Sequence, residues 1–488
     1  MRIMGVILPA VVLASWSPVL GSVDFPPLPT FKQRVNYVEW YEKASRVPEK
    51  DNAYALYAEF VPGMTDGDAK ESDWPEFAGM VSTQRQVDAM TGVPTTERSW
   101  RSQPAPWYPD RRGSWETSYS RAKPVLKQFA AAAKKKVCVT PAGIDGSRDE
   151  NNARLARVNV NYVSSLRQCA LGELDAAWRV GKKGSVSAKT FLRCIEANLK
   201  MAGQFNESLF AAEHLSAYQV RSLTYHHLRW AFAHGVLTSK DAAAVVKMLD
   251  RVDDDPLDIS PTLRLDCAVW LDNVQYIYGP LGGGTKLNGN RYRDVTGQSM
   301  AGNRFGLGAR MEADPPETAR AILAAHEEMA RHMGPGYSQQ ASMAIVEAAR
   351  KLAGKNNLTK GMLYGLETSY ASHYEQAARC EAERRGTRVL AELFAYKAEN
   401  KKWPKKLSNL DKKSIGKDLI DPFTGKPFRY LPDDNEPFFY SVGPDGVDDG
   451  AVHSSEWGHG ADYIFWPIPD SRPAIAAAKL NGLAEEKF

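Results

Sequence analysis

The stretch from residue 421 to residue 463 constrains the fold of this chain most strongly. Two runs rich in aromatic residues, 427–431 and 437–442, flank a short acidic turn. Short aromatic runs separated by Asp, Asn and Pro are typical of a β-hairpin. A loop of Asp and Gly follows at 443–450. Such a loop suits calcium, because carboxylates supply oxygen ligands and Gly allows tight bends.

The charge of this stretch also favours a cation. Six acidic residues lie from Asp433 to Asp449, with no Lys or Arg among them. Carboxylates that are brought together repel one another unless a cation or solvent screens them. A solvated loop is the simpler alternative. His453, Glu456 and His459 follow at a spacing that suits zinc or another transition metal, whereas the Asp and Gly set favours a cation that binds oxygen only.

Three spaced motifs and the helical run before them resemble a known family. The motifs follow one another in order, as Asp421-Pro422-x-x-Gly425-x-Pro427-x-x-Tyr430, Phe438-x-Tyr440-Ser441-x-Gly443-x-Asp445-Gly446 and Ala461-Asp462-Tyr463-Ile464. The helical run at 389–400 ends before Trp403-Pro404. Together these features are similar to the C-terminal domain of the major pseudopilin (protein G) of bacterial type II secretion. The resemblance covers about the last fifth of the chain.

The resemblance implies a small α+β domain at residues 371–470, in which a long helix precedes the hairpin. It also implies a calcium ion that holds the loop, because family members bind calcium there. Carried over position by position, the resemblance makes Asp445 and Asp462 the best side-chain ligands. It makes Asp448 and Asp449 further ligands of the same ion.

This chain departs from the family pattern in two ways. The interval from Asp445 to Asp462 is longer than in the family, because of an insertion that contains His453, Glu456, Trp457 and His459. A pseudopilin also begins with a basic leader, a cleavage site and a long apolar helix. Here the matching domain lies at the far end of the chain with no such helix before it. We therefore do not expect this chain to assemble into a pseudopilus.

The remainder of the chain predicts a mainly α-helical body at residues 31–370. Apolar residues recur at helical spacing, and the predicted helical stretches are 31–62, 117–136, 151–252, 263–278, 316–332, 339–355 and 360–400. One run, 171–178, has the spacing of a tetratricopeptide-type helix hairpin, but the match does not repeat. The segment at 63–115 is rich in Gly, Pro, Ser and Trp and is expected to be irregular. Gly386 is expected to weaken the last helix, as a kink or a domain border.

The N-terminus predicts export. Arg2 precedes an apolar run at 3–16, and Val19-Leu20-Gly21 offers small or neutral residues before a cut, which indicates a signal peptide at 1–21. An uncleaved anchor is the alternative. A Pro-rich linker follows at 22–30, and residues 471–488 form a tail. No other segment approaches a membrane-spanning length. We therefore expect a periplasmic or extracellular location in a bacterium.

The composition of the 488 residues excludes several classes of protein. Hydrophobic residues make up 43% and charged residues 25%, as in ordinary soluble proteins. The net charge of +4 is small and gives no case for binding nucleic acid. The five cysteines are few, odd in number and widely spaced. This excludes a disulfide-dense scaffold and any Cys-x-x-Cys metal motif, and favours buried thiols.

Two motifs in the body imitate known sites without meeting their requirements. Residues 279–286 are Gly-rich, but Thr285 precedes Lys286, which is the reverse of a phosphate-binding loop. His326 and His332 lie six positions apart, whereas a zinc protease helix needs a spacing of four. We interpret the first motif as a flexible loop and the second as a solvated helix.

A group of histidines in the body supports a second function class. His227 and His234 lie two helical turns apart, and His226 precedes them. With His214 and Glu213 they could form the site of an extracytoplasmic hydrolase or ligand-binding enzyme. Core and surface packing is the simpler interpretation of such a group.

The sequence favours a non-catalytic function. We expect the helical body to act as an exported scaffold or partner-binding module. The C-terminal domain is expected to be a calcium-stabilised cap that contacts protein partners, such as secretion or envelope machinery. The hydrolase with its site on the helical body is the alternative, and a diverged pseudopilin is a third possibility.

Overall fold

The computed structural model describes most of the helical body and most of the C-terminal region. The described ranges are 24–31, 35–61, 112–141, 143–145, 154–156, 187–206, 208–233, 235–252, 258–278, 314–333, 337–353, 366–410, 415–453 and 461–468, with residues 166, 169, 170, 291, 295 and 457. The predicted signal peptide, the predicted tail, the run at 171–178 and nearly all of the segment at 63–115 lie outside these residues.

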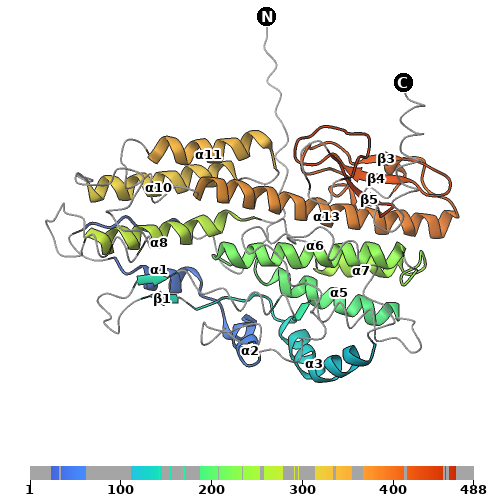
Figure 1. Cartoon of the computed structure of the whole chain (residues 1–488), viewed down its shortest axis with the longest axis horizontal. Coiled ribbons are helices and arrows are strands. Elements are labelled where there is room, and N and C mark those ends of the chain that lie inside the picture. The colour runs from blue at the N-terminus through green and yellow to red at the C-terminus, as the bar shows by residue number, and fades with distance from the viewer. Residues whose placement is uncertain are drawn as a thin grey trace, which may run out of the picture.

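The described part of the chain is mainly helical, as predicted (Figure 1). Its ten α-helices are α1 (Tyr37–Ala44), α2 (Tyr54–Ala58), α3 (Arg112–Ala132), α5 (Ala188–Gly203), α6 (Ala211–Ala233), α7 (Ala242–Val252), α8 (Ser260–Tyr278), α10 (Pro315–His332), α11 (Gln339–Ala353) and α13 (Leu366–Asn400). Short 3₁₀ turns follow α1 and α13, at Glu49–Asp51 and Leu407–Asn409. No described helix is long and apolar enough to cross a membrane.

A small antiparallel sheet near the C-terminus contains the predicted hairpin. Its strands are β3 (Arg429–Leu431), β4 (Phe438–Ser441) and β5 (Tyr463–Trp466), in that order across the sheet. Tyr430 lies opposite Phe439 in the first pair. Tyr440 lies opposite Ile464 in the second, where the register shifts at a bulge. The predicted hairpin is confirmed in β3 and β4.

A second, two-stranded sheet corrects the prediction of continuous helix from residue 151. β1 (Gly143–Asp145) pairs with β2 (Arg154–Ala156), so that Leu155 lies opposite Ile144. The Leu155 N–H donates to Asp272 Oδ2 on α8, at 2.6 Å. The apolar side chains after Leu155 have helical spacing, but residues 154–156 form a strand. The bond to the Asp272 carboxylate and the pairing with β1 stabilise the strand here. Tertiary contacts therefore decide the local conformation here.

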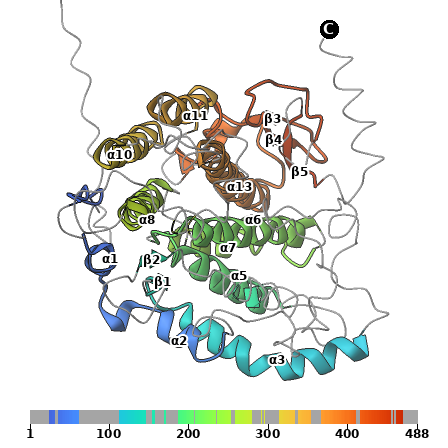
Figure 2. The ribbon, with the colours of Figure 1, turned by 60° about the vertical axis from the view of Figure 1, so that its left-hand side comes forward.

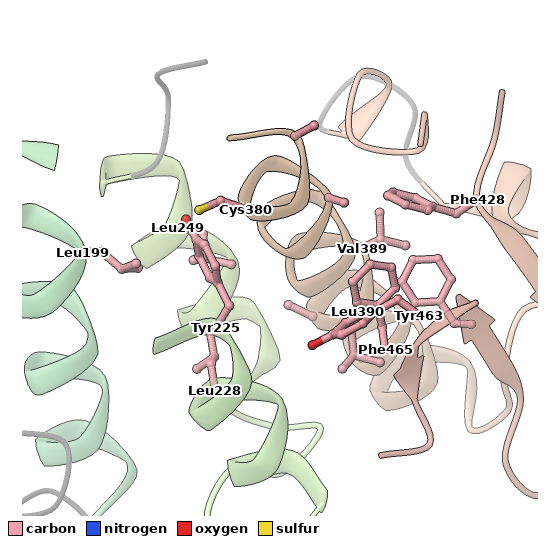
Figure 3. Close-up of a cluster of buried hydrophobic side chains, with 14 of the residues drawn as sticks. Leu199, Tyr225, Leu228, Leu249, Cys380, Val389, Leu390, Phe428, Tyr463 and Phe465 are labelled. Atoms are coloured by element: carbon pink, nitrogen blue, oxygen red, sulfur yellow. The ribbon is translucent and has the colours of Figure 1, made fainter. Parts of the chain in front are cut away.

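Helix α13 lies between the helical body and the C-terminal sheet. Figures 1 and 2 show α6 and α7 on one side of α13 and the sheet on the other. One hydrophobic core runs through all three layers (Figure 3). It includes Leu228 of α6, Leu390 of α13 and Phe465 of β5, each fully buried. The sheet and the body therefore share α13 as a common packing surface.

A buried arginine joins the same three layers through polar contacts. Arg229 of α6 donates to Thr387 Oγ1 of α13 at 2.8 Å and to the Tyr463 hydroxyl of β5 at 3.0 Å. It also forms an ion pair with Glu383 of α13, at 3.3 Å. Its guanidinium lies 5.5 Å from the centre of the Phe465 ring, a cation–π contact.

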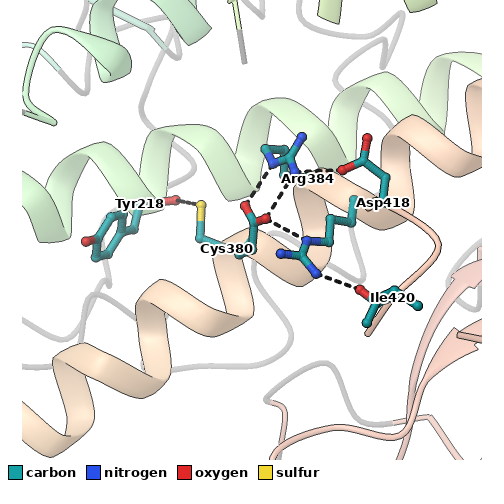
Figure 4. Close-up of polar contacts among 7 residues, drawn as sticks. Tyr218, Cys380, Arg384, Asp418 and Ile420 are labelled. Atoms are coloured by element: carbon teal, nitrogen blue, oxygen red, sulfur yellow. Dashed lines mark hydrogen bonds and ion pairs between the residues drawn. The ribbon is translucent and has the colours of Figure 1, made fainter. Parts of the chain in front are cut away.

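A second polar network holds the chain after α13 against that helix (Figure 4). Arg384 forms ion pairs with Glu381 at 2.8 Å and with Asp418 at 2.7 Å. Arg385 pairs with Glu381 and donates to the Ile420 carbonyl, at 2.8 Å. Burial raises the pKa of Glu381, but the two arginines outweigh that effect and hold it below its ordinary value. The carboxylate therefore stays charged and paired.

Gly386, which was expected to weaken this helix as a kink or a domain border, does not interrupt α13. The helix runs from Leu366 to Asn400 as one element. A Cβ built at Gly386 would lie 2.6 Å from the Phe465 ring. Phe465 is fully buried and packed among other aromatic rings, so it has little room to move. The sequence thus needs Gly at this position for close packing of helix and strand.

Replacing Gly386 with Ala tests this close approach. An Ala in a helix interior gains about 1 kcal/mol over Gly, whereas overpacking a core costs about 1–3 kcal/mol. We expect Gly386→Ala to lower the free energy of unfolding, measured by denaturant titration. Gly203→Ala at the end of α5 is the control, because its Cβ would meet only Arg221 at an ordinary 3.6 Å. Equal stabilisation by both changes would contradict the tight contact.

Candidate functional site

The acidic loop after β4 begins at a turn that Asp421 fixes. Asp421 is buried and accepts hydrogen bonds from the Phe423 N–H, at 3.0 Å, and from the Ser441 hydroxyl, at 2.8 Å. The Val442 N–H donates to the same carboxylate oxygen as Ser441, at 3.3 Å. Burial raises the pKa of Asp421, and these three bonds partly offset the effect. The Asp-Pro motif therefore fixes where β4 ends and the loop begins.

Strand β4 divides the six acidic residues of this region into two groups. Asp433, Asp434 and Glu436 lie in the β3–β4 turn, before the strand. Asp445, Asp448 and Asp449 lie after it. A strand of four residues separates the groups by roughly 13 Å. The repulsion argument from the sequence therefore applies only to the second group, which is joined by Asp462.

Asp462 lies at the centre of the loop. It is fully buried, and its two oxygens accept the N–H groups of Asp449, at 3.3 Å, and Ala451, at 2.6 Å. Burial raises the pKa of Asp462 to about 7, and the charges of Asp448 and Asp449 add to the effect while the two amide bonds oppose it. The loop therefore closes around a carboxylate whose charge is costly to hold.

Asp448 is engaged by a positive side chain from β3. Its Oδ2 lies 2.9 Å from Arg429 Nε. Its Oδ1 accepts the Tyr440 hydroxyl at 3.1 Å and the Gly450 N–H at 3.3 Å. These bonds orient the Asp448 carboxylate toward the sheet.

The other two predicted ligands differ from each other. Asp449 Oδ2 is enclosed by protein and has no hydrogen-bond partner within the described part of the chain. Asp445 Oδ1 accepts the Val447 N–H, at 3.1 Å, which closes a local turn. Among the described residues, no three His, Cys, Asp or Glu side chains are arranged to enclose a metal ion as they stand.

The donor chemistry of the loop nevertheless fits a hard cation. Asp448 and Asp449 both act on the charge of Asp462, so three carboxylates share one neighbourhood. The enclosed oxygen of Asp449 has no protein partner to satisfy it in the described structure. Calcium takes oxygen ligands only and accepts irregular geometry. The residues that would hold it are Asp448, Asp449 and Asp462, with Asp445 three positions before Asp448 in the chain.

Two described residues of the insertion after Asp445, His453 and Trp457, contact α13 and β5. Trp457 is buried, and its ring stacks on Tyr463 with the ring centres 4.0 Å apart. Arg379 of α13 donates to the Trp457 carbonyl, at 3.4 Å. His453 Nδ1 accepts the Ile464 N–H, at 3.1 Å, so this nitrogen is committed to the backbone. Glu456 and His459, the other two predicted zinc donors, lie outside the described residues.

The start of α6 buries Glu213 and His214 among backbone and hydroxyl groups. Glu213 accepts hydrogen bonds from the hydroxyls of Thr140 and Ser208. His214 Nε2 donates to the Ser208 carbonyl, at 2.7 Å. Burial raises the pKa of Glu213 to about 8 and lowers that of His214 to about 4. Both side chains are therefore neutral at pH 7 and join the loop before α6 to its neighbours.

The histidines farther along α6 do not share a site with Glu213. His227 lies fourteen positions after Glu213 on the same helix, which is roughly 21 Å along the axis. His227 Nδ1 donates to the Leu223 carbonyl at 2.7 Å, and burial lowers its pKa to about 4. His226 packs against Trp230, with ring centres 5.5 Å apart. His234 lies outside the described residues. His226 and His227 therefore do not join Glu213 in the alternative site that the sequence suggested.

The structure describes only one of the two motifs that imitate known sites, the histidine pair His326 and His332. The Gly-rich run at 279–286 lies outside the described residues. In α10, His326 is fully buried, with Nε2 3.6 Å from Asp266 Oδ2 of α8. The expectation of a solvated helix is wrong for His326, because its face of α10 packs on α8. His332 is partly exposed beside Glu328, as expected for a helix end.

The buried Glu213 gives a pH dependence that can be measured. Its pKa in the folded chain lies above the ordinary 4.5, so the folded chain keeps this proton longer than the unfolded one. The contribution to stability is complete below about pH 4.5. It declines as the pH rises toward 8, by up to about 1.4 kcal/mol per pH unit. We expect the free energy of unfolding of Glu213→Gln, followed by denaturant titration, to lack this decline. Parallel curves for both proteins would contradict a buried neutral Glu213.

Comparison with other proteins gives no independent assignment. No family model, no curated protein and no solved structure matches this chain.

Proposed function

We propose that this protein is an exported, non-catalytic scaffold that binds partner proteins and carries a calcium-stabilised, pseudopilin-like C-terminal unit. The observation that carries the proposal is the position of α13. This helix is enclosed by the sheet on one side and by α6 and α7 on the other (Figure 2). A unit built this way is a rigid part of a larger body, which suits a structural role.

The polar groups of the body support the same function. His214 and His227 donate hydrogen bonds to backbone carbonyls, and the Arg229 guanidinium bonds to Thr387 of α13. Side chains used in this way stabilise packing. The hydrolase alternative needs His and carboxylate groups that converge on one cleft. Its named residues are separated along α6, so the scaffold is the better supported of the two.

The geometry of α13 also bears on the third possibility, a diverged pseudopilin. A filament subunit must present its long helix to neighbouring copies. Here α6, α7 and α11 of the same chain already contact α13. This supports a scaffold that borrows the pseudopilin-like unit. The association with secretion or envelope machinery rests on the resemblance alone.

Calcium is proposed at Asp448, Asp449 and Asp462. When bound, the ion would neutralise the crowded carboxylates and supply a partner to Asp449 Oδ2. The protein's own part is to hold the loop: Asp462 fixes two of its amides, and Tyr440 orients Asp448. A ligand that binds only the folded chain stabilises it in proportion to the logarithm of its concentration.

Thermal unfolding of the full chain in calcium and in chelator tests this site. At about a hundred times the dissociation constant, calcium should add about 2.7 kcal/mol. We expect Asp449→Asn to weaken the calcium effect, because the change removes a charge and one of the two carboxylate oxygens. Asp434→Asn is the matched control: it removes an exposed acid from the other end of β4. An equal calcium response of both variants, or none in the unaltered chain, would refute the site.

Export is tested by the mature N-terminus. Cleavage of the predicted signal peptide after residue 21 would leave a chain that begins at Ser22. We expect intact-mass measurement of the protein purified from a bacterial envelope fraction to give this species. Recovery of the full-length chain in the membrane fraction would instead favour the uncleaved anchor.

A further inference from the structure

Helix α3 combines a buried apolar face with an outer face whose described charges are all positive. Leu126 and Phe129 are buried against α2 and α5, and the Phe129 ring centre lies 6.2 Å from that of Tyr57. Residues 121–136 include six basic residues and no acidic one. Four of the six are exposed on α3 or directly after its end, and we call them the basic face: Arg121, Lys123, Lys127 and Lys134. The helix runs along the edge of the molecule opposite to α10 and α11 (Figure 2).

The fold uses the other two basic residues of this run. Lys136 forms an ion pair with Asp51 of the adjoining 3₁₀ turn, at 3.3 Å. Lys135 Nζ donates to the Lys50 carbonyl, at 2.8 Å. In the part of the chain that the structure describes, no acidic side chain pairs with a member of the basic face. The basic face is therefore a positive surface that the described fold does not neutralise.

Helix stability does not account for this pattern. Side chains one turn apart on other described helices form ion pairs of opposite charge: Glu39 with Lys43, Glu196 with Lys200, and Glu375 with Arg379. Lys123 and Lys127 have the same spacing but like charge, which destabilises a helix. The helix dipole favours a cation only near the last turn, as at Lys134. The positive charge of Lys123 and Lys127 thus needs a reason outside the chain.

We propose that the basic face of α3 lies on a membrane surface that carries anionic phospholipid headgroups. Each Lys or Arg near such a surface strengthens binding about fivefold, over distances of about one Debye length. The inference adds a membrane contact to the proposed scaffold. It rests on the proposed export for the identity of the membrane, which is then that of the bacterial envelope. It does not depend on the calcium site.

The composition of the basic face favours lipid over a protein partner. Protein interfaces are enriched in aromatic residues and Arg, and depleted in Lys. Three of the four members are Lys, and the exposed large apolar side chains of the described residues lie elsewhere, at Leu28, Met343, Val447 and Val452. The small net charge of +4 disfavours nucleic acid. Headgroups require only dispersed positive charge, which flexible Lys side chains provide.

Cosedimentation of the exported protein with vesicles tests the contact. One set of vesicles contains phosphatidylglycerol and phosphatidylcholine, and the other contains phosphatidylcholine alone. At low salt the unaltered chain should bind only the anionic set, and binding should fall as salt is added. Replacing both Lys123 and Lys127 with Gln should weaken this binding about twenty-five-fold, at about fivefold per charge. Gln is a good helix former, so thermal unfolding should show that the variant folds.

The matched control replaces Arg350 and Lys351 with Gln. Both are exposed in the last turn of α11, on the opposite side of the molecule from α3 (Figure 2). This change also removes two positive charges, so it alters the net charge of the chain equally. The control variant should bind anionic vesicles as the unaltered chain does.

Each outcome supports or overturns the membrane contact. Anionic-vesicle binding that weakens in the α3 variant alone supports it. Absence of binding by the unaltered chain, or equal binding to both kinds of vesicle, overturns it. Equal weakening in both variants overturns the assignment to α3, because net charge would then suffice. Binding to soluble polyglutamate but not to vesicles would assign the face to an acidic protein instead. The proposed export fails separately, through the mass of the mature chain.

Discussion

The contact of Arg229 with α13 and β5 is the interaction on which the rest of the described structure depends. A buried guanidinium is tolerated only where several acceptors satisfy it. Glu383, Thr387 and Tyr463 supply them from two other layers. Removing one partner of such a pair typically costs about 3–5 kcal/mol, because the remaining charge is left buried. The helical body and the C-terminal sheet are therefore coupled energetically and cannot be treated as two independent cores.

This coupling explains why α13 could be predicted as a helix but its surroundings could not. The spacing of Ala382, Val389 and Leu393 predicts one apolar stripe, and all three residues are buried. The polar residues between them indicate a solvated opposite face. Several of these are buried as well: Arg388 pairs with Asp250 of α7, and Arg384 with Asp418. Ion pairs between layers depend on the tertiary structure, so the spacing of apolar residues along the helix does not predict them.

The same distinction separates what the sequence predicted at the candidate site from what it missed. Short runs rich in aromatic residues and the acidic turn between them were enough to place β3 and β4. The roles of Asp462, which closes the loop, and of Arg429, which pairs with Asp448, depend on strands that meet only after folding. The one usable signal for Arg429 was its place in the first hairpin strand. Likewise β2 escaped prediction because its amide bonds to Asp272, more than a hundred residues away.

The loop and the body meet at two consecutive residues, Asp462 and Tyr463, the second of which begins β5. Asp462 holds the loop amides, and Tyr463, the next residue, bonds to Arg229 and stacks on Trp457 of the insertion. Successive side chains of a strand point to opposite faces, so Asp462 serves the loop while Tyr463 serves the core. The chain leaves no flexible spacer between them. A displacement of Asp462 would also move Tyr463, and the close-packed aromatic rings around Tyr463 resist that movement. This makes the geometry of the acidic loop a property of the whole fold.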